Sequence, residues 1–163
     1  LTTQLTGDGD VSMLIGDNHI QVQLQEVTIT TRIIKDPYPD YEGVIPKNNT
    51  NHLTVNRLNL LSGVDRVSTI ANEKSPSIKF KLLKNLINLS TVNNENSTAT
   101  EDIPAKYEGS DIEIGFNSRY IMDILDNLEG EEIKLSFNDN STPIIVQEHS
   151  KSELIYVLMP MRV

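Results

Sequence analysis

Cysteine and tryptophan are absent from this 163-residue sequence. Without cysteine the chain can form neither a disulfide framework nor a thiolate metal site, which suits a reducing compartment. No apolar run approaches the ~20 residues of a membrane-spanning helix, and no basic-then-apolar leader is present, so the sequence predicts a soluble protein. Aromatic residues make up only 5% of the chain, and a core of leucine, isoleucine and valine is expected.

Catalytic and cofactor-binding patterns are also missing. The three histidines, His19, His52 and His149, are far apart and lack metal-ligand spacing, so structural or surface roles are expected. The acidic pair Glu131 and Glu132 lies beside a glycine, where a solvated turn is the ordinary explanation. No calcium loop, dinucleotide fingerprint or phosphate loop occurs. We expect no enzyme, no metal and no cofactor.

The charge balance excludes a general nucleic-acid binder. The chain has 14 Lys and Arg residues against 23 Asp and Glu residues, a net charge of −9. A protein that holds nucleic acid by charge should be basic, because affinity comes mainly from neutralised phosphates. Binding to DNA would therefore require a mechanism other than strong electrostatic attraction.

The first part of the chain predicts strands after the end of a helix. Residues 1–5 resemble the last turns of a helix that Gly7 stops. Runs of β-branched residues with turn residues between them predict antiparallel strands at residues 11–15, 20–24 and 27–33. Residues 35–51 contain three prolines and are expected to form an ordered connector.

Two helices alternate with strands in the remainder. An apolar stripe at helical spacing predicts a helix over residues 54–71 with Thr54 as its N-cap. Asn117 or Ser118 is expected to cap a second helix, which Gly130 stops. Strands are expected at residues 78–83, 86–92, 100–107, 111–116, 132–137, 144–147 and 154–159.

The sequence contains an internal repeat. Leu5-Thr6-Gly7, a strand and Asp17-Asn18 recur as Leu128-Glu129-Gly130, a strand and Asp139-Asn140. A helix followed by strands appears again from residue 54 to residue 92. The fold class expected is therefore α+β, with antiparallel sheets built from repeated helix-plus-strands units.

The carboxyl end is unusual for a terminus because it is apolar and rich in methionine. It reads Tyr156-Val157-Leu158-Met159-Pro160-Met161-Arg162-Val163. Termini are usually polar unless something ties them down. This segment either closes the core as a final strand or provides a binding surface, for which the adaptable methionine side chain is well suited.

A resemblance favours the binding surface. The tail resembles the C-terminus of the bacterial sliding clamp family, the beta subunits of DNA polymerase III. Tyr38-Pro39-Asp40-Tyr41 with Val44-Ile45-Pro46-Lys47, and Ile112 to Asn117 leading into Tyr120, also agree with that family in the same order. The resemblance implies the DNA-clamp fold with two helices per domain. It assigns residues 1–46 to the C-terminal half of a second clamp domain plus connector, and residues 47–163 to the third, C-terminal domain.

Such clamps are replication processivity factors of the bacterial cytoplasm. By resemblance, the chain is part of a ring-shaped, head-to-tail homodimer that encircles double-stranded DNA without sequence specificity. The ring is held by topology, which accommodates the acidic composition. The partners implied are the polymerase III alpha subunit, the clamp loader and repair polymerases, which bind through short extended peptides containing glutamine, leucine and phenylalanine. A chain without the first domain is expected not to close that ring.

The resemblance also implies site residues. The partner-peptide pocket would be lined by Pro39, Val44, Asn117, Tyr120, Ile144, Val157, Leu158, Met159, Pro160, Met161 and Arg162. Gly43 departs from the family, because some clamps carry an arginine there. Arg57, Arg66 and Arg119 are expected to face DNA. Thr69 and Ile70 fall at the subunit interface.

A secreted β-rich adhesion or structural domain is the alternative. The pattern Asn-x-Ser/Thr, which marks glycosylation in secreted proteins, occurs at Asn48, Asn88, Asn96 and Asn140. An asparagine-rich sequence produces such triplets by chance, and Asn88 falls in an expected strand, so this alternative is the weaker one.

Overall fold

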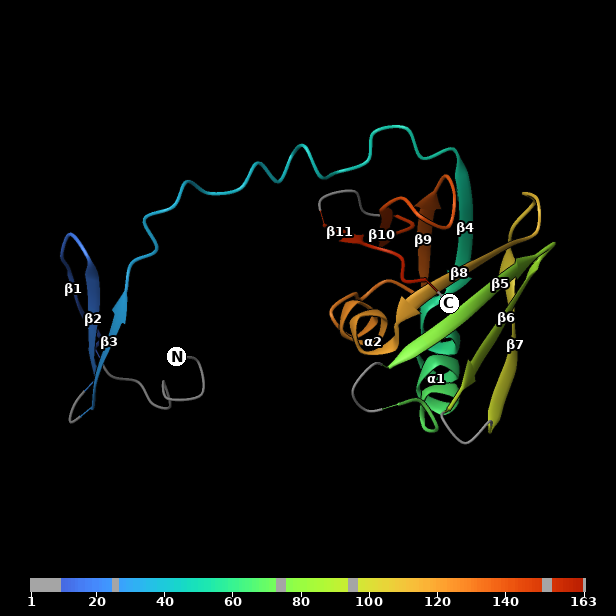
Figure 1. The fold of residues 1–163 in the computed structure, drawn as a ribbon, viewed down its shortest axis with the longest axis horizontal. Helices are drawn as coiled ribbons and strands as arrows, with labels where there is room; N and C mark the ends of the chain where they lie inside the picture. Colours follow the sequence, from blue (N-terminus) through green and yellow to red (C-terminus); the bar gives the residue numbers. More distant parts are fainter. Residues whose placement is uncertain (1–9, 25–26, 73–75, 94–96, 151–153, 163) are drawn as a thin grey trace. The chain divides into compact units, whose positions relative to one another are not determined.

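The structure is a computed structural model, and it describes residues 10–24, 27–72, 76–93, 97–150 and 154–162. The chain forms two compact units, Leu1–Asp40 and Tyr41–Val163 (Figure 1). The helix end expected at residues 1–5 lies outside the described residues. Each unit is described by itself below.

The first unit is a three-stranded antiparallel meander. Strands β1 (Ser12–Ile15), β2 (His19–Leu24) and β3 (Val27–Arg32) pair in the order β1-β2-β3. They coincide with the three strands expected from the β-branched runs. Val22 in the central strand is buried, whereas Leu14 and Ile15 of β1 are 68% and 72% exposed. The unit therefore has apolar residues at its surface.

Among its described residues, the second unit contains two helices and eight strands. Its elements are β4 (Asn51–Asn56), α1 (Arg57–Ser68), β5 (Ser77–Leu83), β6 (Leu86–Val92), β7 (Thr98–Lys106), β8 (Ile112–Asn117), α2 (Ser118–Asp126), β9 (Glu132–Phe137), β10 (Ile144–Glu148) and β11 (Ile155–Leu158). The strands are ordered β11-β10-β9-β4-β7-β6-β5-β8 and every pairing is antiparallel. The predicted α+β class, with antiparallel sheets and two helices, is confirmed.

The second unit contains the same arrangement of elements twice. The first copy is β4-α1-β5-β6-β7 and the second copy is β8-α2-β9-β10-β11. The first strand of each copy pairs with the meander of the other copy, since β4 lies beside β9 and β8 lies beside β5. A short β4–β7 pairing joins the two halves of the sheet. The helix-plus-strands unit expected from residue 54 to residue 92 is therefore repeated in the second unit, whereas Leu5-Thr6-Gly7 of the predicted repeat lies outside the described residues.

Both helices begin at an asparagine that follows a strand. The side chains of Asn56 and Asn117 accept hydrogen bonds from the backbone amides of Asn59 and Arg119, which would otherwise lack partners in the first turn. The cap at Asn117 was expected, whereas the cap expected at Thr54 is wrong. Residues 51–56 form β4 because Leu53 and Val55 alternate into the core.

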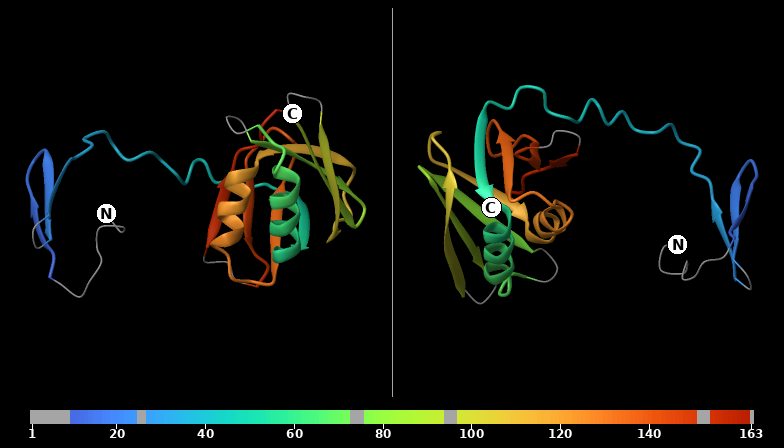
Figure 2. Two further views of the ribbon diagram at one scale, coloured as in Figure 1. Left: turned by 90° about the horizontal axis from the view of Figure 1, so that it is seen from below. Right: turned by 180° about the vertical axis from the view of Figure 1, so that it is seen from behind.

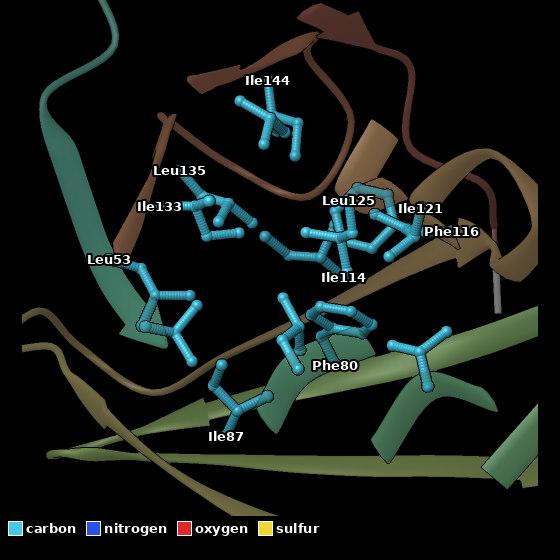
Figure 3. Packing of buried hydrophobic residues seen from close by; sticks show 14 of the residues in the cluster. Leu53, Phe80, Ile87, Ile114, Phe116, Ile121, Leu125, Ile133, Leu135 and Ile144 are labelled. Carbon is cyan, nitrogen blue, oxygen red and sulfur yellow. The ribbon is translucent and has the colours of Figure 1, made fainter. Parts of the chain in front are cut away.

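The helices lie side by side, and the sheets pass behind them (Figure 2). Gly63 lets α1 approach the sheet closely, because a Cβ atom there would lie 2.5 Å from Ile103 Cδ1. The core between helices and sheets draws on both repeats: Phe80 and Phe116 meet edge to face at 5.1 Å between ring centroids, and Leu53, Leu125 and Leu135 point toward the same space (Figure 3).

Candidate functional site

The chain after β11 crosses to the opposite edge of the sheet. The amide of Met161 donates a hydrogen bond of 2.8 Å to the carbonyl oxygen of Gly115 in β8, and the two residues form an isolated antiparallel bridge. β8 and β11 are the first and last strands in the sheet order, so this bridge links its two edges. The tail is therefore a fixed part of the second unit and can support a site.

A cavity of about 320 Å³ lies between α2 and β11. It is lined by Tyr120, Asp123, Ile124, Asn127, Tyr156, Val157 and Leu158. Tyr120, Asp123 and Ile124 of α2 and its C-cap Asn127 are spaced by three, one and three positions, which places them on one face of the helix. Two to three side chains of a short peptide could enter a hollow of this size, which falls at the low end of small-ligand sites.

Apolar surface continues from this cavity. Tyr120 is 58% exposed and Met159, which follows β11, is 59% exposed. The phenol ring of Tyr120 in the lining, and the thioether of Met159 one residue after the lining residue Leu158, offer exposed area that a ligand can cover, and both can adjust their position. Polar atoms at the rim come from Asp123 and Asn127. The arrangement suits apolar anchors whose orientation is fixed by a few hydrogen bonds.

The structure brings together only some of the predicted pocket residues. Tyr120, Val157 and Leu158 line the cavity. Met159 is exposed near it, and Pro160 and Met161 are half-buried in the segment that reaches β8. The Asn117 side chain serves as the cap of α2.

Three other predicted residues are placed differently. Ile144 is fully buried in the core opposite Leu158, because it occupies an inward position of β10, and it does not line the cavity. Arg162 lines a separate groove beside β5 and β6. Val44 is 58% exposed in the segment before β4, and Pro39 belongs to the first unit.

Sequence reasoning missed Asp123, Ile124, Asn127 and Tyr156 among the lining residues. The first three could have been found, because they follow Tyr120 at helical spacing and face the same way. Tyr156 shares a strand face with Leu158, since side chains two positions apart in a strand point the same way. Helical spacing from Tyr120 and strand alternation from Leu158 would thus have predicted more of the residues that line the cavity.

The three arginines expected to face DNA have different surroundings. The Arg57 guanidinium donates to the carbonyl oxygens of Leu125 at 2.8 Å and Gly130 at 3.1 Å, so it ties α1 to the end of α2. Arg66 forms a two-pronged ion pair with Glu101, which lowers the pKa of that carboxyl. Arg119 is exposed in the first turn of α2.

The residues expected at a subunit interface lie at the end of α1. Thr69 is the C-cap, and its hydroxyl donates to the Asp65 carbonyl oxygen at 3.2 Å. It is exposed, whereas Ile70 is half-buried. A residue at such a helix end can contact a second chain without disturbing the core, so the position allows the predicted role.

Shifted carboxyl pKa values lie outside the cavity. Hydrogen bonds from Lys79 and Lys106 lower the pKa of Glu113 and of Glu132. Lys79 and Glu113 are surface groups on the neighbouring strands β5 and β8, at 3.3 Å, and Lys106 and Glu132 are surface groups on β7 and β9, which flank β4, at 2.7 Å. Surface pairs of this kind contribute little to stability and do not indicate a catalytic group.

Within the described part of the chain, no three His, Asp or Glu side chains are grouped so that they could hold a metal ion. A search of the same residues finds no helix with the length and hydropathy needed to cross a membrane. Of the glycosylation triplets, Asn88 lies in β6 and donates to Asp102 Oδ1 at 2.6 Å, and Asn96 lies outside the described residues.

Comparison with known proteins gives a consistent result. Residues 42–162 match the family model described as DNA polymerase III beta subunit, C-terminal domain. The chain is 31% identical over 155 residues to the beta sliding clamp of Pseudomonas aeruginosa and 29% identical over 156 residues to that of Escherichia coli. These alignments cover 95% and 96% of the chain but 42% and 43% of the relatives.

Solved structures agree with these alignments. A sliding clamp from Bartonella birtlesii, solved bound to griselimycin, superposes with a TM-score of 0.82 at 34% identity, over 99% of this chain and 44% of that one. A sliding clamp from Pseudomonas aeruginosa superposes with a TM-score of 0.81 at 30% identity. The chain thus spans less than half the length of the relatives it matches.

Proposed function

The chain belongs to the family of bacterial DNA polymerase III beta subunits, the sliding clamps, and on this basis we propose that it tethers replication and repair proteins to DNA by capturing short peptides. The protein performs no bond-making chemistry in this proposal. It acts in the bacterial cytoplasm as part of a ring around duplex DNA. Residues 1–46 are the C-terminal half of the second clamp domain plus the connector, and residues 47–163 form the third domain.

The cavity between α2 and β11 supports the peptide-binding part of this proposal. It combines an exposed aromatic ring at Tyr120, apolar walls from Ile124 and Leu158, and polar rim groups. Partner peptides of this family carry a glutamine with leucine and phenylalanine anchors. The anchors bury in the cavity, and the glutamine side chain hydrogen-bonds at the rim, where Asp123 can accept and Asn127 can both donate and accept.

The expected affinity is moderate. Burying one leucine or phenylalanine side chain contributes roughly 1.5–3 kcal/mol, and two anchors contribute about twice that before the cost of ordering the peptide is subtracted. Binding in the micromolar range follows, which lets different partners exchange on one clamp. The polymerase III alpha subunit, the clamp loader and repair polymerases are the proposed partners.

The DNA-binding part of the proposal requires little affinity. A closed ring is retained on duplex by its topology, so the net charge of −9 is compatible with sliding. Arg66 and Arg119 remain proposed contacts to the phosphates, and Thr69 and Ile70 remain proposed contacts to the next subunit. Arg57 is also retained in the proposal, although two backbone carbonyls already bind its guanidinium.

Titration of a glutamine-leucine-phenylalanine peptide tests the cavity. We expect it to shift the methyl resonances of Met159 and Ile124, and Tyr120→Ala to weaken binding by about tenfold, since an aromatic contact is lost. Leu58→Ala is the matched control, because Leu58 is 56% exposed on α1 and does not line the cavity. Equal affinity of the two variants would contradict the assignment, and so would the absence of any methyl shift.

A further inference from the structure

A second hollow lies on the other side of the tail, between the tail and strands β5, β6 and β7. It is a groove of about 410 Å³, and Lys79 and Arg162 supply two cationic side chains to it. The tail separates it from the cavity, because Leu158 lines the cavity and Arg162, four residues later, lines the groove. None of the residues expected from the sequence to line a pocket, other than Arg162, belongs to this groove.

The groove is lined by cationic side chains, whereas the chain as a whole has a net negative charge. Lys79 Nζ lies 3.3 Å and Lys81 Nζ 3.6 Å from the carboxylate oxygens of Glu113, so one acid is shared by two lysines. Among the residues that line the groove, Lys79 and Arg162 are cations and none is acidic, in a chain with 23 acids and 14 bases. An ammonium group has three donors, and the single contact to Glu113 leaves Lys79 able to bind a second oxygen.

Hydroxyl groups complete the lining. They belong to Ser77, Ser90, Thr91 and Thr98. The Thr91 hydroxyl donates to the Ser77 carbonyl oxygen at 2.7 Å, which fixes the base of the groove. The hydroxyls of Ser77, Ser90 and Thr98, with the ammonium and the guanidinium, are donors that line one hollow and suit a carboxylate, and the guanidinium can bind both of its oxygens at once. The exposed Val92 adds apolar contact for the carbons of an acidic side chain.

We propose that this groove binds an acidic side chain of the same partner segment whose apolar anchors occupy the cavity. The inference rests on the proposed function and adds the class of residue that should flank the anchors. Successive residues of an extended chain advance about 3.3 Å, so the four steps from Leu158 to Arg162 correspond to roughly 13 Å. A partner segment therefore needs its acid about four positions from its nearest anchor. A single carboxylate fits better than a nucleic acid, because neighbouring acids such as Asp102 and Glu113 repel a polyanion.

Paired peptides test the inference. Each peptide carries the glutamine, leucine and phenylalanine anchors. The two peptides of a pair differ only in having glutamate or glutamine at the fourth position from the nearest anchor. This position follows the anchors in one pair and precedes them in the other. In one of the two placements, the glutamate peptide should bind about three- to tenfold more tightly at low salt, and the gain should shrink as salt rises. Lys79→Gln should abolish the gain while the glutamine peptide binds as before.

Lys81→Gln is the matched control. Lys81 shares strand β5, the outward face and the partner Glu113 with Lys79, but it does not line the groove. The gain should survive in this variant. Equal affinity of glutamate and glutamine peptides in both placements, or an equal loss of the gain in the two variants, would overturn the inference while leaving the proposed function intact. Failure of every peptide to bind would overturn the proposed function and this inference together.

Discussion

The amide of Met161 and the carbonyl oxygen of Gly115 are joined by a hydrogen bond of 2.8 Å. Gly115 is buried, and the backbone of Met161 in the tail lies against it through this bridge. The same bond fixes the segment that separates the cavity from the cationic groove. Both the backbone amide and the side chain of Met161 can contribute to the stability of this segment. Substitutions can separate the two contributions.

Met161→Pro and Met161→Ala form a matched pair for this purpose. Proline removes the amide donor, whereas alanine keeps it and removes only the thioether. We expect Met161→Pro to lower the free energy of unfolding by about 1 kcal/mol more than Met161→Ala, which is the usual worth of one such bond. Urea denaturation measures this difference. The amide resonances of the β8 residues Gly115 and Phe116 should move in the proline variant and stay in place in the alanine variant. Equal unfolding energies would show that the bridge does not hold the tail.

The backbone of Gly130 is held on both its amide and its carbonyl side. Its amide donates to Glu148 Oε1 at 2.9 Å, and its carbonyl oxygen accepts from Arg57 Nε at 3.1 Å. Glu148 is buried and also accepts from the Glu129 amide at 2.8 Å. The loop between α2 and β9 is thus fixed by residues from β10 and from the first turn of α1.

Removing either partner should destabilise the fold. We expect Arg57→Ala and Glu148→Ala each to cost about 1–3 kcal/mol of unfolding free energy, because each leaves backbone groups without a partner. The double variant should cost less than the sum by at least about 0.5 kcal/mol, since the two residues bind the backbone of the same residue, Gly130. Chemical denaturation of the four proteins gives this coupling.

A conservative variant and a surface variant serve as controls. Glu148→Gln keeps an acceptor oxygen and should be less damaging than Glu148→Ala. Arg119→Ala, on the exposed surface of α2, should change stability by no more than about 0.5 kcal/mol. Additive losses in the double variant would mean that Arg57 and Glu148 act on the loop independently.

Local patterns in the sequence were sufficient for most elements. The strand alternation around Val22, the cap at Asn117 and the repeated order of helix and strands all depend on neighbours in the chain, and the structure has them. β4 was missed because Val55 fits both a strand alternation with Leu53 and a helical stripe with Leu58. The pairing of β4 with β9, about 80 residues later, decides in favour of the strand.

Only part of the site could be predicted, because some of its contacts also join residues that are far apart in the sequence. The tail residues were found through a resemblance, and the α2 residues beside Tyr120 could have been added from helical spacing. The surroundings of Arg57 could not be predicted, because its acceptors are carbonyl oxygens 68 and 73 residues away. Local sequence identifies Arg57 as a cation near a helix start and contains no information about which backbone atoms it meets.

The surroundings of His52 in β4 lower the pKa of its imidazole ring. Its Nδ1 lies 3.1 Å from Ser136 Oγ, across the β4–β9 pairing. Partial burial lowers the pKa of the ring below 6.5, and the nearby Lys134 ammonium lowers it further. Between the folded-state pKa and 6.5 the unfolded chain binds more protons at this residue than the folded chain does. Stability should therefore rise with pH through that window, and it should be lost as the solution becomes more acidic.

Substitution of the neighbouring cation separates the two causes of this shift. Lys134→Gln should raise the pKa of His52 only part of the way to 6.5, because burial is the larger cause and remains. An NMR titration of the His52 ring in both proteins measures the change directly. His52→Gln should flatten the dependence of unfolding free energy on pH just below 6.5, since the titrating group is gone. If Lys134→Gln returned the pKa fully to 6.5, the charge of Lys134 would be the whole cause and burial would contribute nothing.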